Sequence, residues 1–216
     1  MSDSFVYNPP KEPWLNILYQ DRDLLVIDKP SGLLSVPGRI YSDSVLSRVL
    51  SQEERAYAVH RLDMDTSGLL LIALRRKAEK ALMEEFRLRR VHKEYIAIVS
   101  GEIQQSKGVI SAPLSRCSGN PPRSVVDWEN GKAAQTEYEV IRSSTARTVV
   151  QLFPKTGRSH QLRVHLLHLG HPIIGDRFYF PECEEERLML HAQRLIFDHP
   201  YHGKKMDFVS HVPFGV

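Results

Sequence analysis

Hydrophobic residues occur along this chain mostly in short blocks, which charged residues, glycine and proline separate. Short blocks that are rich in leucine and β-branched residues are typical of β-strands. The predicted strands are Leu24–Lys29, Ala56–Arg61, Leu69–Leu74, Tyr95–Val99, Ala133–Ile141 and Thr148–Phe153. The connection between the last two is short, so these two strands are predicted to form a hairpin.

Helical spacing of hydrophobic residues is found in fewer places. A helix is predicted over 77–89, with an apolar face formed by Ala78, Leu82 and Phe86. A short helix is predicted over 45–50, and another over 159–169 with Ser159 as N-cap and Gly170 as C-terminal stop. Because strands outnumber helices and do not alternate regularly with them, the predicted fold class is α+β. We expect a large mixed, mainly antiparallel sheet flanked by helices and loops.

The composition is that of an ordinary soluble globular protein, with 42% hydrophobic and 25% charged residues. The length fits a single domain over 1–216 that includes a short N-terminal extension over about 1–20. The apolar runs are too short to cross a bilayer, and the N-terminus does not resemble a signal peptide. Cys117 and Cys183 lack the spacing of a redox or metal motif, so free thiols in a reducing cytoplasm are expected.

The formal net charge is only +3, but its distribution is uneven. The basic residues form two clusters, namely Arg75, Arg76, Lys77 and Lys80, and Arg87, Arg89, Arg90, His92 and Lys93. Such clusters suit contacts with the phosphates of a nucleic acid. A solvated helix face is the alternative, because Glu79, Glu84 and Glu85 partly balance the charge.

The segment 60–68, with the sequence HRLDMDTSG, is the strongest candidate for a reacting site. Arg61 and Asp63 are two residues apart, so in an extended segment their side chains project to the same side. A buried strand follows directly, and it would hold the Asp63 carboxylate at its edge. A turn between strands also collects Asp, Thr, Ser and Gly. The pattern by itself therefore leaves both a structural turn and a catalytic carboxylate open.

Two further segments contain residues with chemical potential. Arg158, in the segment KTGRSHQLRVH over 155–165, lies at the mouth of a predicted helix, where the helix dipole prefers anions. This position indicates that Arg158 binds a carboxylate elsewhere, with Asp63 as the candidate, although an exposed arginine remains the alternative. Tyr95 lies in an otherwise apolar strand, where a core position and a platform for a nucleobase are both consistent with the sequence.

A group of histidines raises the question of a metal site. Its members are His160, His165, His168, His171 and His191. Those on the predicted helix do not fall on a single stripe, and no cysteine or carboxylate completes a ligand set. We therefore predict no metal site, and a metal-dependent hydrolase that uses the histidines is kept as an alternative function.

Taken together, these segments resemble the RluA family of RNA pseudouridine synthases. The family's motifs are matched as HRLDxxTSG at 60–68, KxYxAxVxG at 93–101, TGRxHQxRVH at 156–165, GHPIxGD at 170–176 and LHA at 190–192. Their order and spacing fit over about residues 20–210. The start of the chain is similar to that of the small dual-specificity member of the family, and it leaves no room for the S4-type RNA-binding domain of larger relatives.

The resemblance implies a pseudouridine synthase-like fold and an isomerase that converts uridine to pseudouridine without a cofactor. It implies that Asp63 is the catalytic carboxylate, which either attacks C1′ or removes the 2′ proton. Arg158 would pair with Asp63, and Tyr95 would stack on the uracil. The residues implied in RNA or base binding are Arg61, His60 and Thr66, and Arg61 would fill the gap that a flipped uridine leaves.

The same resemblance implies two RNA substrates, the tRNA anticodon stem-loop and a hairpin of 23S rRNA. We expect a monomer that acts without a membrane or a nucleotide cofactor. The remaining alternative is a non-catalytic RNA-binding module, in which Asp63 and Arg158 form a structural ion pair.

Overall fold

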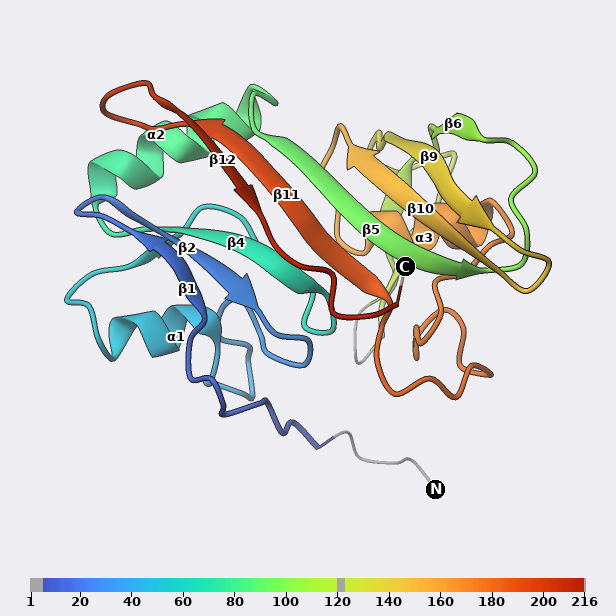
Figure 1. Cartoon of the computed structure of the whole chain (residues 1–216), viewed down its shortest axis with the longest axis horizontal. Helices are drawn as coiled ribbons and strands as arrows, with labels where there is room; N and C mark the ends of the chain where they lie inside the picture. The colour runs from blue at the N-terminus through green and yellow to red at the C-terminus, as the bar shows by residue number, and fades with distance from the viewer. Residues whose placement is uncertain (1–5, 120–122, 216) are drawn as a thin grey trace. The chain divides into compact units, whose positions relative to one another are not determined.

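The computed structural model describes residues 6–119 and 123–215, and it divides the chain into two compact units (Figure 1). The first unit contains the chain up to Arg90 together with Phe197–Met206. The second contains Val91–Ile196 together with the residues from Asp207 onward. The prediction of a single catalytic domain over 1–216 stays a prediction.

The first unit is built around a small antiparallel sheet with two helices. Its elements are β1 (Ile17–Gln20), β2 (Leu24–Lys29), α1 (Val45–Leu50), β3 (Tyr57–Ala58), β4 (Ser67–Ala73) and α2 (Arg76–Arg87). β2 pairs with both β1 and β4, and β3 pairs with the end of β4. β2 and β4 are almost wholly buried, which explains why their sequences are continuous apolar runs rather than alternating ones. α2 packs against β4 and buries Ala78 and Leu82, as the helical spacing predicts.

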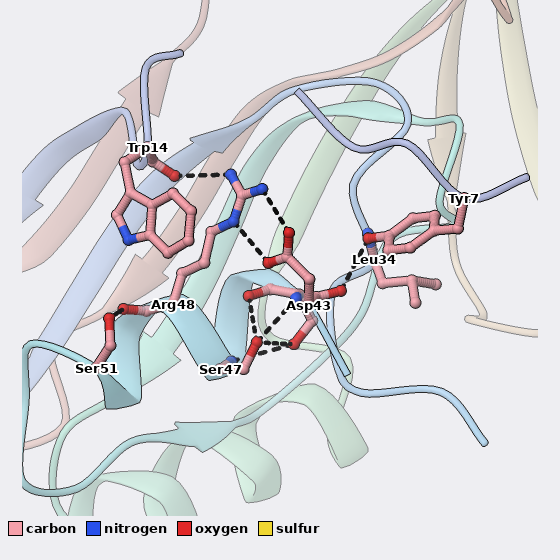
Figure 2. A network of polar contacts seen from close by, with 8 residues as sticks. Tyr7, Trp14, Leu34, Asp43, Ser47, Arg48 and Ser51 are labelled. Atoms are coloured by element: carbon pink, nitrogen blue, oxygen red, sulfur yellow. Dashed lines mark hydrogen bonds and ion pairs between the residues drawn. The ribbon is translucent and has the colours of Figure 1, made fainter. Parts of the chain in front are cut away.

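Figure 2 shows how the N-terminal segment is attached to α1 in this unit. Arg48 is nearly inaccessible to solvent, and its guanidinium forms two hydrogen bonds of 2.8 Å with the Asp43 carboxylate. A third hydrogen bond reaches the Trp14 carbonyl oxygen, and the guanidinium carbon lies 4.2 Å from the centre of the Trp14 ring. Tyr7 donates a hydrogen bond to the Asp43 carbonyl and accepts one from the amide of Leu34. The segment before β1 is therefore bound to the unit by a buried cation.

The second unit is a larger antiparallel sheet covered by one helix. Its elements are β5 (His92–Ser100), β6 (Lys107–Ile110), β7 (Leu114–Arg116), β8 (Ser124–Val126), β9 (Thr136–Ser143), β10 (Arg147–Pro154) and α3 (Gln161–His168). β11 (Leu190–Asp198) and β12 (Lys205–Val209) each contain residues of both units. Within this unit the strand order is β11-β5-β10-β9-β6, and β7 and β8 form a separate pair. Leu162 and Leu166 of α3 join Val99, Val150 and Leu152 of the sheet in one core.

The predicted α+β class is confirmed. The antiparallel pairings among the described residues include β1–β2, β2–β4, β3–β4, β5–β10, β5–β11, β6–β9, β7–β8 and β9–β10. The predicted hairpin forms from β9 and β10. The predicted strand over Ala56–Arg61 is too long, because only Tyr57 and Ala58 pair with β4. No helix of the described residues has the length and hydropathy that crossing a membrane requires.

The prediction of Ser159 as a helix N-cap is wrong. α3 begins at Gln161, and its N-cap residue is His160, which has a left-handed backbone with φ of 53° and no side-chain capping bond. The predicted stop at Gly170 is confirmed. Gly170 has φ of 88°, its amide donates to the Leu167 carbonyl, and the next amide donates to the Leu166 carbonyl. This pair of hydrogen bonds is the Schellman arrangement, which needs a left-handed residue that glycine adopts without strain.

Candidate active site

Asp63 lies in the loop between β3 and β4 of the first unit. Its side chain is half-buried, whereas the neighbouring Leu62 is buried and Arg61 is exposed. The amide of Thr66 donates a hydrogen bond of 3.2 Å to the Asp63 carbonyl and closes a turn directly after it. The buried Leu62 and the turn at Thr66 thus hold the backbone on either side of Asp63, while Arg61 remains accessible. A loop held in this way can present a reactive side chain in a fixed position.

The fully buried Lys29 ammonium anchors this loop to the end of β2. Its Nζ donates hydrogen bonds to the carbonyl oxygens of Pro30 at 2.8 Å, Leu33 at 2.7 Å and Met64 at 2.9 Å. Met64 directly follows Asp63, so the lysine fixes the backbone one residue away from the carboxylate. A buried ammonium is stable only when its donors are satisfied, and three carbonyl acceptors satisfy all three N–H groups.

A serine completes the attachment on the other side of Asp63. The hydroxyl of Ser35 donates to the Leu62 carbonyl at 2.8 Å and accepts from the Leu62 amide at 3.0 Å. Ser31 donates to the Asp65 carbonyl at 2.7 Å, and the amide of Gly32 donates to the Met64 carbonyl at 2.9 Å. The loop 62–65 is therefore held on the segment 29–35, a relation that the sequence analysis missed.

His60 and Thr66, both predicted to bind RNA or the base, have structural roles in this loop. The Nε2 atom of His60 accepts a hydrogen bond of 2.9 Å from the Leu71 amide, so it is the unprotonated ring nitrogen. The His60 ring also stacks on Phe86, with ring centres 4.7 Å apart. Thr66 is only 3% exposed. Their contribution to RNA binding, like that of the exposed Arg61, stays a prediction.

Tyr95 lies in β5 of the second unit, between the buried residues Glu94 and Ile96. It pairs with Leu152 of β10 and Ala192 of β11. Its side chain is half-buried and packs at the border of the main core. The ring therefore contacts the core and keeps part of its surface accessible, and its role as a platform for a nucleobase stays a prediction.

Arg158 lies just before α3 and is exposed. Its Nε donates a hydrogen bond of 3.1 Å to the Ala133 carbonyl, and its amide donates one of 3.0 Å to Oε1 of Gln161. Gln161 is a hub that also accepts from the Thr156 hydroxyl and donates to Thr136. The predicted pairing of Arg158 with Asp63 joins residues of the two units and stays a prediction.

Arg163 is the charged residue of this segment that the sequence analysis missed. Its side chain is 2% exposed, and its Nε and Nη2 atoms form hydrogen bonds of 2.7 Å with the two carboxylate oxygens of Asp176. Asp176 also accepts from the amides of Phe178 and Tyr179. The sequence could have indicated this pair, because Arg163 lies between Leu162 and Val164, two apolar residues of α3. An arginine at a buried position needs a carboxylate as its partner.

The backbone before Asp176 explains the glycine of the GHPIxGD motif. Gly175 has φ of 73°, and a Cβ at this position would lie 1.9 Å from the Arg187 carbonyl oxygen. Only glycine therefore fits, and the turn brings Asp176 to Arg163.

Among the described residues, the five histidines of the predicted group do not form a candidate metal site. His165 is buried between the Thr136 hydroxyl and the Ala112 carbonyl, and its pKa is lowered by burial. His191 contacts the Ser210 hydroxyl, and burial together with the nearby positive charge of Arg187 lowers its pKa to about 4. His171 contacts the Ser100 carbonyl, and His160 contacts the Tyr179 hydroxyl. Each of these four rings has its own hydrogen-bond partner, which gives the metal-dependent hydrolase no support.

The basic clusters are partly neutralised within the fold. Each of three arginines on or next to α2 forms an ion pair with a nearby glutamate, and the pairs are Arg76–Glu79, Arg87–Glu84 and Arg90–Glu85. Lys77 and Lys80 are exposed on the same helix. Phosphate binding by α2 would therefore depend more on the two lysines than on the number of basic residues.

The sequence and the fold both identify the class of protein. The sequence model of the family described as RNA pseudouridylate synthase matches residues 23–168, which include Asp63, Tyr95, Arg158 and Arg163. The chain therefore belongs to the RNA pseudouridylate synthase family, and it is an RNA-modifying isomerase. The solved structures of human RNA pseudouridylate synthase domain containing 1 and domain containing 4 share the fold, with TM-scores of 0.78 and 0.70. They are 31% and 29% identical, and the matches cover 99% and 92% of this chain and 87% and 88% of those chains.

Among curated proteins, the chain is similar to the dual-specificity RNA pseudouridine synthase RluA of several bacteria. It is 50% identical to that of Escherichia coli (strain K12), over 96% of this chain and 98% of the relative. The enzyme of Vibrio parahaemolyticus is 47% identical, over 90% of this chain and 82% of the relative. The expected pseudouridine synthase activity is thereby confirmed, and the non-catalytic RNA-binding module is not supported.

Proposed function

We propose that this protein modifies uridines in two RNAs, the tRNA anticodon stem-loop and a hairpin of 23S rRNA. The support is its likeness over nearly the whole chain to relatives that are named dual-specificity RNA pseudouridine synthases. The protein acts as a monomer in the cytoplasm, where both RNAs are found. The exposed Lys77 and Lys80 of α2 would bind RNA phosphates, and binding would weaken as the salt concentration rises.

The reaction breaks the N1–C1′ bond of uridine, turns the uracil and reattaches it through C5. We propose that Asp63 is the carboxylate that attacks C1′ or removes the 2′ proton. The observation that supports this role best is the fixed loop, in which Lys29 and Ser35 hold the backbone on both sides of a half-buried carboxylate. A positioned carboxylate needs little reorganisation to reach the reacting carbon.

Tyr95 and Arg61 would act on the base and its vacated position. The half-buried ring of Tyr95 would stack on the uracil, and its hydroxyl would assist in removing the C5 proton. The exposed Arg61 would fill the gap that the flipped uridine leaves and offset part of the cost of unstacking, with His60 and Thr66 supporting the loop.

We propose that Arg158 pairs with the Asp63 carboxylate, because the chain matches the motif TGRxHQxRVH that contains this arginine. A guanidinium can form two parallel hydrogen bonds with a carboxylate and would hold it in a fixed orientation.

The first test is tritium release from RNA that carries uridine labelled at C5, since C5 exchanges its hydrogen only when pseudouridine forms. The anticodon stem-loop and the rRNA hairpin are assayed separately. We expect wild-type protein to release tritium from both, and Asp63→Asn to lower kcat by at least about 10³-fold with RNA affinity retained. Asp65→Asn is the matched control and keeps most of the activity.

Release from only one RNA would contradict the dual specificity but not the chemistry, whereas an active Asp63→Asn variant would contradict the role of Asp63. For the arginine, we expect Arg158→Met to lower kcat and Arg158→Lys to restore part of it. Unchanged kcat in Arg158→Met would exclude Arg158 from this role.

A further inference from the structure

A second group of polar side chains lies in the first unit, away from the loop of Asp63. It combines the turn between β1 and β2 with the residue that follows β11. Within residues 6–119 and 123–215, the donor atoms of Asp21, Asp23 and His199 form a group whose members all lie within 4.8 Å of one another. Two carboxylates and an imidazole are a common ligand set for a divalent transition metal.

Two of these side chains are already oriented by neighbouring groups. Oδ1 of Asp21 accepts hydrogen bonds from the amides of Asp23 and Leu24, and Oδ2 accepts one from the Tyr19 hydroxyl. Nε2 of His199 lies 2.9 Å from Asp21 Oδ2. Hydrogen bonds of this kind fix the direction of the ligands in known metal sites.

The tautomer of His199 follows from its other contact. Its Nδ1 accepts a hydrogen bond of 3.3 Å from the Tyr201 amide, so Nε2 carries the proton that points to Asp21. The ring is 2% exposed and stacks on His202, with ring centres 3.7 Å apart and an interplanar angle of 5°. A metal ion would replace this Nε2 proton, and the imidazole would not need to turn.

Asp23 supplies an independent indication of a ligand. Its Oδ1 atom is buried, and no donor of the described residues forms a hydrogen bond with it. Nε of Arg75 lies 3.5 Å from this oxygen, on a side chain that is 45% exposed. A buried carboxylate oxygen without a hydrogen bond is unfavourable, because it has lost water and gained no partner of equal strength. A cation bound beside it would remove this cost.

We propose that Asp21, Asp23 and His199 bind one divalent transition metal ion, with Zn²⁺ as the best fit. Zn²⁺ takes imidazole nitrogen and carboxylate oxygen at roughly 2 Å in a tetrahedron, and water supplies the fourth ligand. The side chains of Asp23 and Arg75 rotate slightly to admit the ion. The metal joins the β1–β2 turn to residue 199, which belongs to the C-terminal part of this discontinuous unit. Its role is structural and independent of the pseudouridine reaction.

The test is calorimetric titration of the metal-free full-length protein with Zn²⁺, together with thermal unfolding. The variant Cys117→Ser/Cys183→Ser is the starting protein, because free thiols also bind Zn²⁺. We expect one equivalent to bind and Tm to rise with the Zn²⁺ concentration. Asp23→Asn should weaken binding at least about tenfold, because it removes a charged ligand at nearly constant shape.

Asp198→Asn is the matched control, since Asp198 is exposed and directly precedes His199. It should bind Zn²⁺ as the starting protein does. Arg75→Gln should bind more tightly, because it removes the positive charge that competes for Asp23. Equal affinity in the starting protein and in Asp23→Asn would overturn the site, as would the absence of saturable binding. Circular dichroism of each variant confirms that the comparison is between folded proteins.

Discussion

The loop that contains Asp63 and the segment that contains Arg158 and Arg163 are held in place by different chemistry. In the first unit, the buried Lys29 donates to three main-chain carbonyls, and the Ser35 hydroxyl forms hydrogen bonds with both the carbonyl and the amide of Leu62. In the second unit, Arg163 forms a two-bond ion pair with Asp176, and Gln161 connects the strand ends. One region relies on neutral acceptors and the other on an anion.

The difference has a consequence for sensitivity to pH and substitution. Carbonyl oxygens do not titrate, so the acceptors that hold the Asp63 loop stay neutral at every pH. The second unit contains a buried ion pair and the buried histidines His165 and His191, whose pKa values are lowered. We therefore expect the second unit to respond more strongly to a lost charge and to acid.

The largest effect is expected from breaking the buried ion pair. Asp176→Asn leaves the buried Arg163 guanidinium without a carboxylate and should lower the free energy of unfolding by about 3–5 kcal/mol. Chemical denaturation measures the change. The comparison is Asp207→Asn, because Asp207 forms a pair of the same two-bond geometry with Arg194 on the surface of the same unit.

In the surface pair, the side chains of Arg194 and Asp207 are 38% and 41% exposed. Water therefore replaces most of the interaction that Asp207→Asn removes. Asp207→Asn should therefore have a much smaller effect than Asp176→Asn. Equal losses in the free energy of unfolding would show that burial does not make the Arg163–Asp176 pair more important than the surface pair. The proposed difference between the two regions would then be wrong.

A somewhat smaller effect is expected from removing the neutral attachment. Lys29→Met keeps most of the length of the side chain but removes the Nζ donor from the carbonyls of Pro30, Leu33 and Met64, of which Met64 retains the Gly32 amide. The loss should be about 2–4 kcal/mol in the free energy of unfolding. Because the loop then moves, kcat for tritium release should fall more than KM rises.

Lys204→Met is the control, since Lys204 is an exposed lysine of the same unit. It should leave both stability and kcat nearly unchanged. A Lys29→Met variant with reduced stability but wild-type kcat would show that the lysine supports the fold without positioning Asp63.

Much of the fold was predictable because its central strands are continuous apolar runs. β2 and β4 are buried along their length, so their sequences allow few other structures. The start of α3 was missed, because Gln161, through contacts with Gln135 and Thr136 far away in the chain, determines where the helix begins. Local capping rules favoured Ser159, and tertiary hydrogen bonds decided otherwise.

The site was predictable only as far as its motifs extend. Asp63 was singled out by its neighbours in the chain, but Lys29 precedes it by 34 residues and resembles an ordinary exposed lysine at the end of a strand. Arg163 and Asp176 are separated by 13 residues and a turn that only Gly175 permits. Partnerships of this kind depend on the path of the chain, which residue types alone do not specify.

The smallest effect in this comparison concerns acid. Burial and the Arg187 charge hold the pKa of His191 at about 4 in the folded protein, against an ordinary value of 6.5. Well above pH 6.5 the ring is neutral in both states, and its contribution to stability is complete. As the pH falls from 6.5 towards 4, the unfolded chain takes up a proton that the folded protein does not, so stability decreases. Between pH 7.5 and pH 5 this single residue should account for about 2 kcal/mol.

The substitution His191→Gln tests this expectation, because glutamine contacts Ser210 without a titrating ring. The variant should lose about 2 kcal/mol less than wild type between pH 7.5 and pH 5, measured by urea denaturation at each pH. An acid-induced loss that His191→Gln leaves unchanged would assign the sensitivity to other groups, of which the buried His165 is the first to examine. The expectation that the second unit is the more sensitive one would then depend on the Arg163–Asp176 ion pair alone, because His191 would not contribute to its sensitivity to acid.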